Sequence, residues 1–342
     1  MIVLDGSYGE GGGQIVRTAV GLSALLGIPC RIERIRQGRP SPGLKAQHVA
    51  GIKVLLKICR GEAEGLRVGS ETLTFIPGRL RGGSYRIDVG TAGAIGLVLQ
   101  TLMPACVGLP SRLILTITGG TDVKWAPTVL YMKEVLLPIL YRMGFEAEIQ
   151  LLKRGYYPKG GGMISFSARG AELQGVDLRE RGEVLGIYGV SHASKSLQSR
   201  RVAERQREAA LSVLRKKRME AEIKVRYEET PSPGSGIDLW ALCEGSILGA
   251  NSLGERGKRA ETVGQEAASS LLRELESGAA LDRHMGDQIL PFLAIAKGPS
   301  VVSVSEPSGH LETNIWVIRH FPQCEPLELQ KEKGKWIIKT KG

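Results

Sequence analysis

The predicted secondary-structure elements of this 342-residue chain recur in the same order, and this repeat limits the fold more than any single motif does. Hydrophobic periodicity predicts a βαβαββ order from the N-terminus to about residue 76, and the same order returns between residues 85 and 168. A third, split copy is expected between residues 287 and 339, lacking its first strand unless one precedes residue 184. Matching units of about 85 residues indicate duplication and an α/β (α+β) fold.

Residues 182–277 interrupt the repeat and are predicted to form a separate small α+β domain. We therefore expect residues 1–181 to hold the first two repeats of a large domain and residues 278–342 to hold the third. The insertion includes a strongly basic helix from Lys195 to Met219. Its charges fit either a solvated helix face or a track for a phosphate backbone.

The segment Asp5-Gly-Ser-Tyr-Gly-Glu-Gly-Gly-Gly-Gln-Ile-Val-Arg17 predicts a strand end, a glycine-rich loop and a helix in succession. Such a junction presents backbone N–H groups at the positive end of a helix dipole, and glycines let an oxyanion come close. Glu10 is the only acid inside the loop, and a carboxylate beside a bound phosphate normally needs a divalent cation between the charges. Gln14 and Arg17 would face the loop from one side of the helix. The pattern alone fits phosphate binding and tight backbone packing equally well.

Composition narrows the class of ligand. Lysine and arginine exceed aspartate and glutamate by 46 − 35 = 11, which favours polyanionic partners such as nucleic acid or nucleotides, although basic enzymes with small substrates also exist. No run approaches the ~20 apolar residues of a membrane span and no signal peptide is evident, so a cytoplasmic location is expected. The five scattered cysteines indicate neither a disulfide framework nor a zinc site.

One of the five histidines occupies a position suited to catalysis. His310 lies in Ser305-Glu-Pro-Ser-Gly-His-Leu-Glu-Thr-Asn314, predicted to be a turn between an apolar strand and a helix. The sequence near His310 shows no Ser-His-Asp or Cys-His order, and no second histidine or cysteine lies at metal-ligand spacing. A histidine near phosphate-binding loops suits nucleophilic attack on phosphorus, because neutral imidazole is a good nucleophile at pH 7. The alternative is a polar turn residue without a catalytic role.

Several segments, taken together and in order, resemble the RNA 3′-terminal phosphate cyclase family. Besides the glycine-rich segment, they are Arg36-Gln-Gly-Arg-Pro-Ser-Pro-Gly-Leu-Lys-Ala-Gln-His48, Gly119-Gly-Thr-Asp122, Tyr157-Pro-Lys-Gly-Gly-Gly162 and His310-Leu-Glu-Thr-Asn314. The resemblance spans nearly the whole chain. It implies a large domain of three repeated α/β units related to enolpyruvyl transferases, with a smaller inserted domain, in agreement with the repeat.

The resemblance also implies a reaction. In this family a histidine at the position of His310 attacks the α-phosphate of ATP in the presence of Mg²⁺ or Mn²⁺, and the AMP then passes to an RNA 3′-phosphate. The neighbouring 2′-hydroxyl attacks that activated phosphate and gives a 2′,3′-cyclic phosphate and AMP. The chain would thus be an enzyme, an RNA 3′-terminal phosphate cyclase that uses ATP in a ligase-type nucleotidyl transfer. Its partner would be RNA with a 3′-terminal phosphate. No membrane partner is expected. The oligomeric state stays open, a homo-oligomer included.

The resemblance assigns roles residue by residue. His310 is the implied catalytic residue, and Glu10 is the implied metal ligand. The implied nucleotide-binding residues are Gln14, Arg17, His284, Asp287 and Gln288, and the implied residues for the RNA terminal phosphate are Arg39 and Gln47. His284 stands where many relatives have tyrosine, so stacking on the adenine is expected to be weaker or base choice looser.

Three alternatives remain at this point. A branch of the superfamily lacks the catalytic histidine and serves ribosome assembly, but His310, Arg17 and Arg39 argue against it. An enolpyruvyl transferase would have no use for a nucleophilic histidine. A non-enzymatic RNA-binding module would tolerate the substitution His310→Ala.

Overall fold

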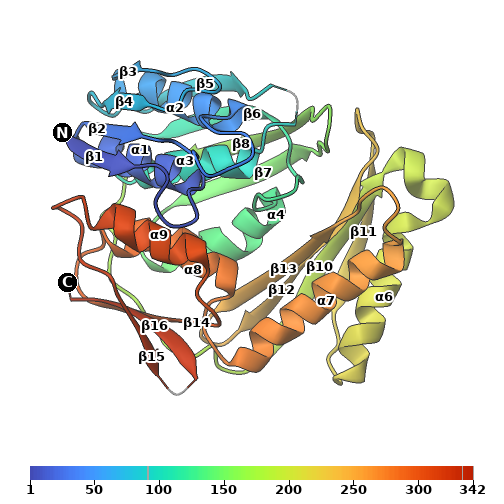
Figure 1. Cartoon of the computed structure of the whole chain (residues 1–342). Coiled ribbons are helices and arrows are strands. Elements are labelled where there is room, and N and C mark those ends of the chain that lie inside the picture. Colours follow the sequence, from blue (N-terminus) through green and yellow to red (C-terminus); the bar gives the residue numbers. More distant parts are fainter. Residues whose placement is uncertain (91, 333, 342) are drawn as a thin grey trace.

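The computed structural model describes residues 1–90, 92–332 and 334–341, and within them four sheets of four strands each form (Figure 1). The first sheet has the order β1-β2-β4-β3, with β1 and β2 parallel and the other pairs antiparallel. Its unit consists of β1 (Ile2–Asp5), α1 (Gln14–Leu26), β2 (Cys30–Glu33), α2 (Ala46–Cys59), β3 (Glu62–Glu64) and β4 (Leu73–Ile76). The third strand was predicted at residues 65–68 and instead precedes the turn at Gly65.

The second sheet, β5-β6-β8-β7, repeats this order and the same parallel and antiparallel pairings. Its unit consists of β5 (Gly83–Asp88), α3 (Ile95–Cys106), β6 (Leu113–Gly119), α4 (Val129–Tyr131), η1 (Met132–Leu136), α5 (Leu137–Arg142), β7 (Ala147–Lys153) and β8 (Gly162–Ala168). The single helix predicted here is therefore α4, one π-helical turn and α5 in succession.

The third sheet has the equivalent order β9-β14-β16-β15. Its unit consists of β9 (Asp177–Leu178), α8 (Arg283–Leu293), β14 (Ser300–Val304), α9 (Gly309–Ile318), β15 (Glu328–Glu332) and β16 (Lys335–Thr340). The strand that the third copy lacked is β9, which pairs in parallel with β14. The third unit therefore begins before the insertion and is completed after it.

Between β9 and α8 the chain forms the fourth sheet, β11-β10-β12-β13, inside the range 182–277 expected for an inserted domain. The elements are β10 (Val184–Ser194), η2 (Lys195–Arg200), α6 (Val202–Lys216), β11 (Glu222–Glu228), β12 (Ser235–Cys243), β13 (Ile247–Leu253) and α7 (Ala260–Ser277). Helices α6 and α7 pack side by side against this sheet around an apolar core of their own (Figure 1). The basic helix predicted from Lys195 is two pieces, a 3₁₀ helix and α6, because Arg201 between them has a positive φ of 50°.

The helices of the three repeated units meet in one continuous apolar core. Helix α1 packs against α3 and α9, while α8 packs against α9 and α3. This packing gathers the beginnings of α1, α8 and α9, which carry most of the predicted site residues.

Two helices begin earlier than the sequence predicted. The prediction placed their starts near Asp287 and Thr313, but α8 begins at Arg283 and α9 at Gly309. The reason is capping: Asp282 accepts hydrogen bonds from the backbone N–H groups of the first turn of α8, and the Ser308 hydroxyl does so for α9. His310 therefore lies in the first turn of a helix and not in the preceding turn. Within the described residues no helix has the length and apolar character needed to cross a membrane.

Candidate active site

The glycine-rich loop between β1 and α1 is fixed against α9. Gly9 and Gly11 have φ angles of 57° and 54°, in the left-handed region that glycine adopts without strain. The ring of Tyr8 stacks on Trp316 of α9, with centroids 4.1 Å apart and an interplanar angle of 11°. The loop is thereby held beside the helix that carries His310.

His310 and Glu10, which come from opposite ends of the chain, lie side by side in the structure. Nε2 of His310 lies 3.2 Å from Oε2 of Glu10, and a guanidinium nitrogen of Arg39 lies 3.7 Å from the same oxygen. Burial lowers the pKa of His310; Glu10 opposes this shift, while Arg17, Arg39 and His284 reinforce it. The imidazole is therefore neutral at pH 7, as a nucleophile must be.

A cavity of about 400 Å³ opens beside His310 and holds six of the nine predicted residues. These six are Gln14, Arg17, His284, Asp287, Gln288 and His310. The walls come from every unit, because Trp125 and Tyr131 of the second repeat and Asn251 of the inserted sheet also line it. The volume suits a nucleotide-sized ligand.

Asp287 is the most perturbed acid of this cavity. Burial raises its pKa to about 7, although the Ser308 hydroxyl, which donates a hydrogen bond to it, and the charge of Arg283 act in the opposite direction. Burial likewise lowers the pKa of Arg17 to about 10, against the charge of Asp287. The charges of Arg17 and Asp287 thus influence each other in a largely desolvated site and would be sensitive to an anion bound nearby.

Hydrogen bonds join the three helices that carry the site. Thr18 of α1 donates to Oδ1 of Asn314 at 2.9 Å, and Nδ2 of Asn314 in α9 donates to the Asp287 carbonyl of α8 at 3.2 Å. The sequence analysis noted Asn314 only as part of a motif and did not identify Thr18. Their bonds fix the relative positions of Arg17, Asp287 and His310.

Polar atoms without partners face the cavity. Both amide atoms of Gln14 and Oε1 of Gln288 are buried without a hydrogen-bond partner in the described part of the chain. A buried polar atom that lacks a partner costs roughly 1–3 kcal/mol, so such atoms commonly await a ligand. The cavity is thus built to receive a polar molecule.

Three predicted residues do not line this cavity. Glu10 lies beside it in contact with His310, and Arg39 is connected to it through an ion pair with Glu10. Gln47, in the first turn of α2, is partly buried and stays a prediction. Its neighbour His48 is buried with Nδ1 accepting from the backbone N–H of Lys45 at 3.0 Å, and burial plus nearby cations lower its pKa to about 3. His48 is therefore a neutral structural residue.

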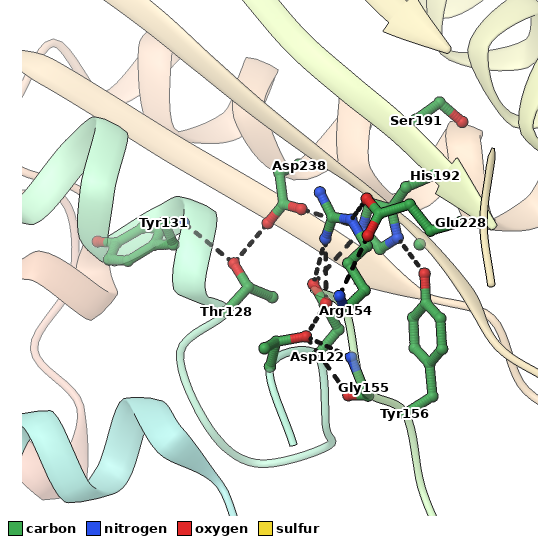
Figure 2. Close-up of polar contacts among 12 residues, drawn as sticks. Asp122, Thr128, Tyr131, Arg154, Gly155, Tyr156, Ser191, His192, Glu228 and Asp238 are labelled. Atoms are coloured by element: carbon green, nitrogen blue, oxygen red, sulfur yellow. Dashed lines mark hydrogen bonds and ion pairs between the residues drawn. The ribbon is translucent and has the colours of Figure 1, made fainter. Parts of the chain in front are cut away.

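A second polar cluster lies where the large domain meets the inserted sheet (Figure 2). Arg154 donates to both carboxylate oxygens of Asp122 at 3.0 Å and, through Nε, to Glu228 at 3.2 Å. Nε2 of His192 lies 3.2 Å from Asp238, and its Nδ1 lies 2.7 Å from the Tyr156 hydroxyl. Asp122, His192 and Asp238 are close enough to share a metal ion, but Arg154 already neutralises Asp122. We therefore interpret the cluster as an ionic connection between loops and strands; the sequence analysis had noted only Asp122, as part of a motif.

The family model described as RNA 3′-terminal phosphate cyclase matches residues 8–326. A protein of Archaeoglobus fulgidus named RNA 3′-terminal phosphate cyclase is 49% identical over 94% of this chain and 95% of its own length. The protein of the same name from Pyrococcus furiosus is 46% identical over 94% of this chain and 93% of its own length.

One solved structure, an EPSP synthase from Acinetobacter baumannii, aligns with 12% identity and a TM-score of 0.24 over 64% of this chain and 55% of its own. That score is too low to support a conclusion. The family model and the relatives do support one: this chain belongs to the RNA 3′-terminal phosphate cyclase family.

Proposed function

We propose that the chain converts an RNA 3′-terminal phosphate into a 2′,3′-cyclic phosphate at the expense of ATP, with His310 as the nucleophile. The observation that carries this proposal is the pairing of His310 with Glu10 at the edge of a nucleotide-sized cavity that also contains Arg17. The names of the relatives support the overall reaction. The use of ATP and the covalent histidine intermediate are our inference from the site.

The proposed chemistry has three displacements at phosphorus. A ring nitrogen of His310 attacks the α-phosphorus of ATP, and the bond to the bridging oxygen breaks to release pyrophosphate. An oxygen of the RNA 3′-phosphate then attacks the same phosphorus and frees the imidazole. Finally the 2′-hydroxyl oxygen attacks the RNA phosphorus, loses its proton, and expels AMP. The first step gives the phosphate monoester a leaving group that it otherwise lacks.

The residues of the cavity fit these roles. Arg17 would neutralise the charge that develops on the transferred phosphate. The unpartnered amide atoms of Gln14 and the unpartnered Oε1 of Gln288 would bond to the nucleotide, with Asp287 and His284 on the same side. Arg39 and Gln47 would hold the RNA terminal phosphate.

Glu10 would be the ligand for Mg²⁺ or Mn²⁺. Its side chain is 38% exposed beside the predicted phosphate position, and a carboxylate oxygen suits both cations. When bound, the cation would offset the negative charges of phosphate and carboxylate.

The test is incubation with ATP labelled in the α-phosphate and Mg²⁺ or Mn²⁺, followed by a denaturing gel. We expect acid-labile label on the wild type and none on His310→Ala. Tyr141→Ala is the control, because this exposed side chain on α5 does not line the cavity and should not affect labelling. A wild type that binds 3′-phosphorylated RNA but takes up no label would instead be a non-catalytic, cyclase-like RNA-binding protein in ribosome biogenesis.

A further inference from the structure

Trp125 combines three unusual properties at the opening of the cavity. Its side chain lines the cavity, yet the residue is 94% exposed. Its φ angle is 59°, in a region that a bulky residue adopts only at a cost of about 1–3 kcal/mol. An indole ring in water gains little from packing that could offset this cost. The strain therefore indicates a purpose outside the fold of the free protein.

The loop that carries Trp125 is held firmly on both sides (Figure 2). Before it, Asp122 is bound by Arg154 and accepts from the Thr121 hydroxyl at 2.6 Å. After it, the Thr128 hydroxyl donates to Asp238 of the inserted sheet. The ring is thus exposed because the loop is fixed in this position, and not because the segment is loose.

The surroundings of the ring suit a nucleic acid. Nζ of Lys124 lies 5.7 Å from the ring centroid and pairs with Glu255 of the insertion. Aromatic platforms beside cationic side chains are the recurring means of binding single-stranded RNA, since every base has a face that can stack. A base stacked here would belong to a strand whose phosphates pass near Lys124.

We propose that Trp125 is the stacking platform for a base at the 3′ end of the RNA substrate, a binding subsite at the opening of the nucleotide cavity. The proposal rests on the proposed function, because it takes the terminal phosphate to lie near His310. The exposure of the ring favours an RNA base over the adenine of ATP as its stacking partner. A nucleotide enclosed by the cavity leaves an almost fully exposed ring uncovered, whereas an RNA chain must leave the cavity through its opening and so passes the ring.

The test measures binding of a 5′-fluorescent, 3′-phosphorylated single-stranded RNA by anisotropy, without ATP, so that no turnover is needed. Trp125→Gly removes the ring and also relieves the strained φ, so its melting temperature should not fall. We expect RNA affinity roughly 5- to 150-fold weaker, the effect of losing one stacked base. Trp125→Phe should bind nearly as well as wild type. The matched control is Tyr141→Ala, an exposed aromatic on α5 that does not line the cavity.

A second RNA, whose 3′-terminal nucleotide lacks its base, tests whether that base is the one that contacts Trp125. Wild type should bind this RNA less tightly, and Trp125→Gly should weaken its binding no further. Undiminished RNA affinity of Trp125→Gly would overturn the proposal. So would an equal loss of ATP affinity, which would assign the ring to the nucleotide base. Wild type that binds RNA but fails to cyclise it would refute the proposed function alone, and wild type without RNA affinity would refute both.

Discussion

Replacing Arg154 by methionine should destabilise the protein more than any substitution of a surface arginine. The side chains of Arg154 and Asp122 are only 3% and 1% exposed, and the guanidinium makes two contacts of 3.0 Å to the carboxylate. Methionine keeps much of the apolar volume and removes the charge. Asp122 would then remain buried with only the Thr121 hydroxyl and the more distant His192 near it.

The expected cost follows from burial. Removing one partner of a buried ion pair costs about 3–5 kcal/mol, because the other charge is left without compensation in a medium that solvates it poorly. The matched control is Arg205→Met. Arg205 makes an equally well-formed pair with Glu261, at 2.8 and 2.9 Å, but the two side chains are 39% and 33% exposed. Water screens that pair, so its loss should cost at most about 1 kcal/mol.

Urea unfolding followed by tryptophan fluorescence gives both free energies, with Trp240 in β12 reporting on the inserted sheet. A double substitution, Arg154→Met with Asp122→Asn, should recover part of the loss, because the buried carboxylate is removed together with its cation; Glu228, which also loses Arg154, is partly exposed. If Arg154→Met costs no more than Arg205→Met, the cluster does not fasten the inserted sheet to the large domain.

The pH dependence gives an independent check. Burial acts to raise the pKa of Asp122, but Arg154, His192 and the hydrogen bonds outweigh it, so the pKa is lowered. In the wild type this carboxylate therefore stabilises the fold above its unfolded pKa of about 3.9, and the contribution disappears as the pH falls through the folded pKa. Without Arg154 burial dominates, and protonation relieves the penalty. The difference between wild type and Arg154→Met should therefore shrink below about pH 4.

Two further substitutions test the site itself. Because the pKa of Asp287 is raised to about 7, the wild type should lose stability as the pH rises from about 4 through 7. The melting temperature of Asp287→Asn should decrease less between pH 5 and pH 8 than that of the wild type. An equal decrease in the two proteins would contradict the assignment. A Cβ added at Gly309 would lie 2.3 Å from Oε1 of Glu10, so Gly309→Ala should displace that flexible carboxylate. Labelling from ATP should decrease, while the melting temperature stays nearly constant. Full labelling would show that the contact between Glu10 and His310 is not needed.

The repeated fold could be predicted because helices and strands of ordinary length carry a clear periodicity. Strand β9 could not, because the two residues Asp177–Leu178 are too short to show an alternation. The starts of α8 and α9 were missed although Asp282 and Ser308 are typical N-cap residues. The prediction also overlooked Met285 and Leu311, which are buried apolar residues in the first turns of these helices.

The sequence suggested members for the candidate site but not their geometry. Glu10 and His310 lie at opposite ends of the chain, and only the resemblance to a family suggested that they act together. The cluster around Arg154 gave even less signal, since its partners come from separate segments and each is an ordinary polar residue when considered alone. Long-range ion pairs have no period in the sequence, and therefore periodicity cannot reveal them.

The inserted sheet forms part of the cavity wall and also holds the loop that contains Trp125. Asn251 of β13 lines the cavity directly, while Asp238 of β12 holds Thr128, beyond the loop that contains Trp125. Arg154 links Asp122, on the other side of that loop, to Glu228 of β11. A buried ionic contact contributes little net stability compared with an apolar one, but it has only one satisfactory geometry. An interface held by ionic contacts therefore fixes the loop relative to α8 and α9. An apolar interface of the same size would instead allow the two surfaces to slide, and the cavity wall would move away from His310.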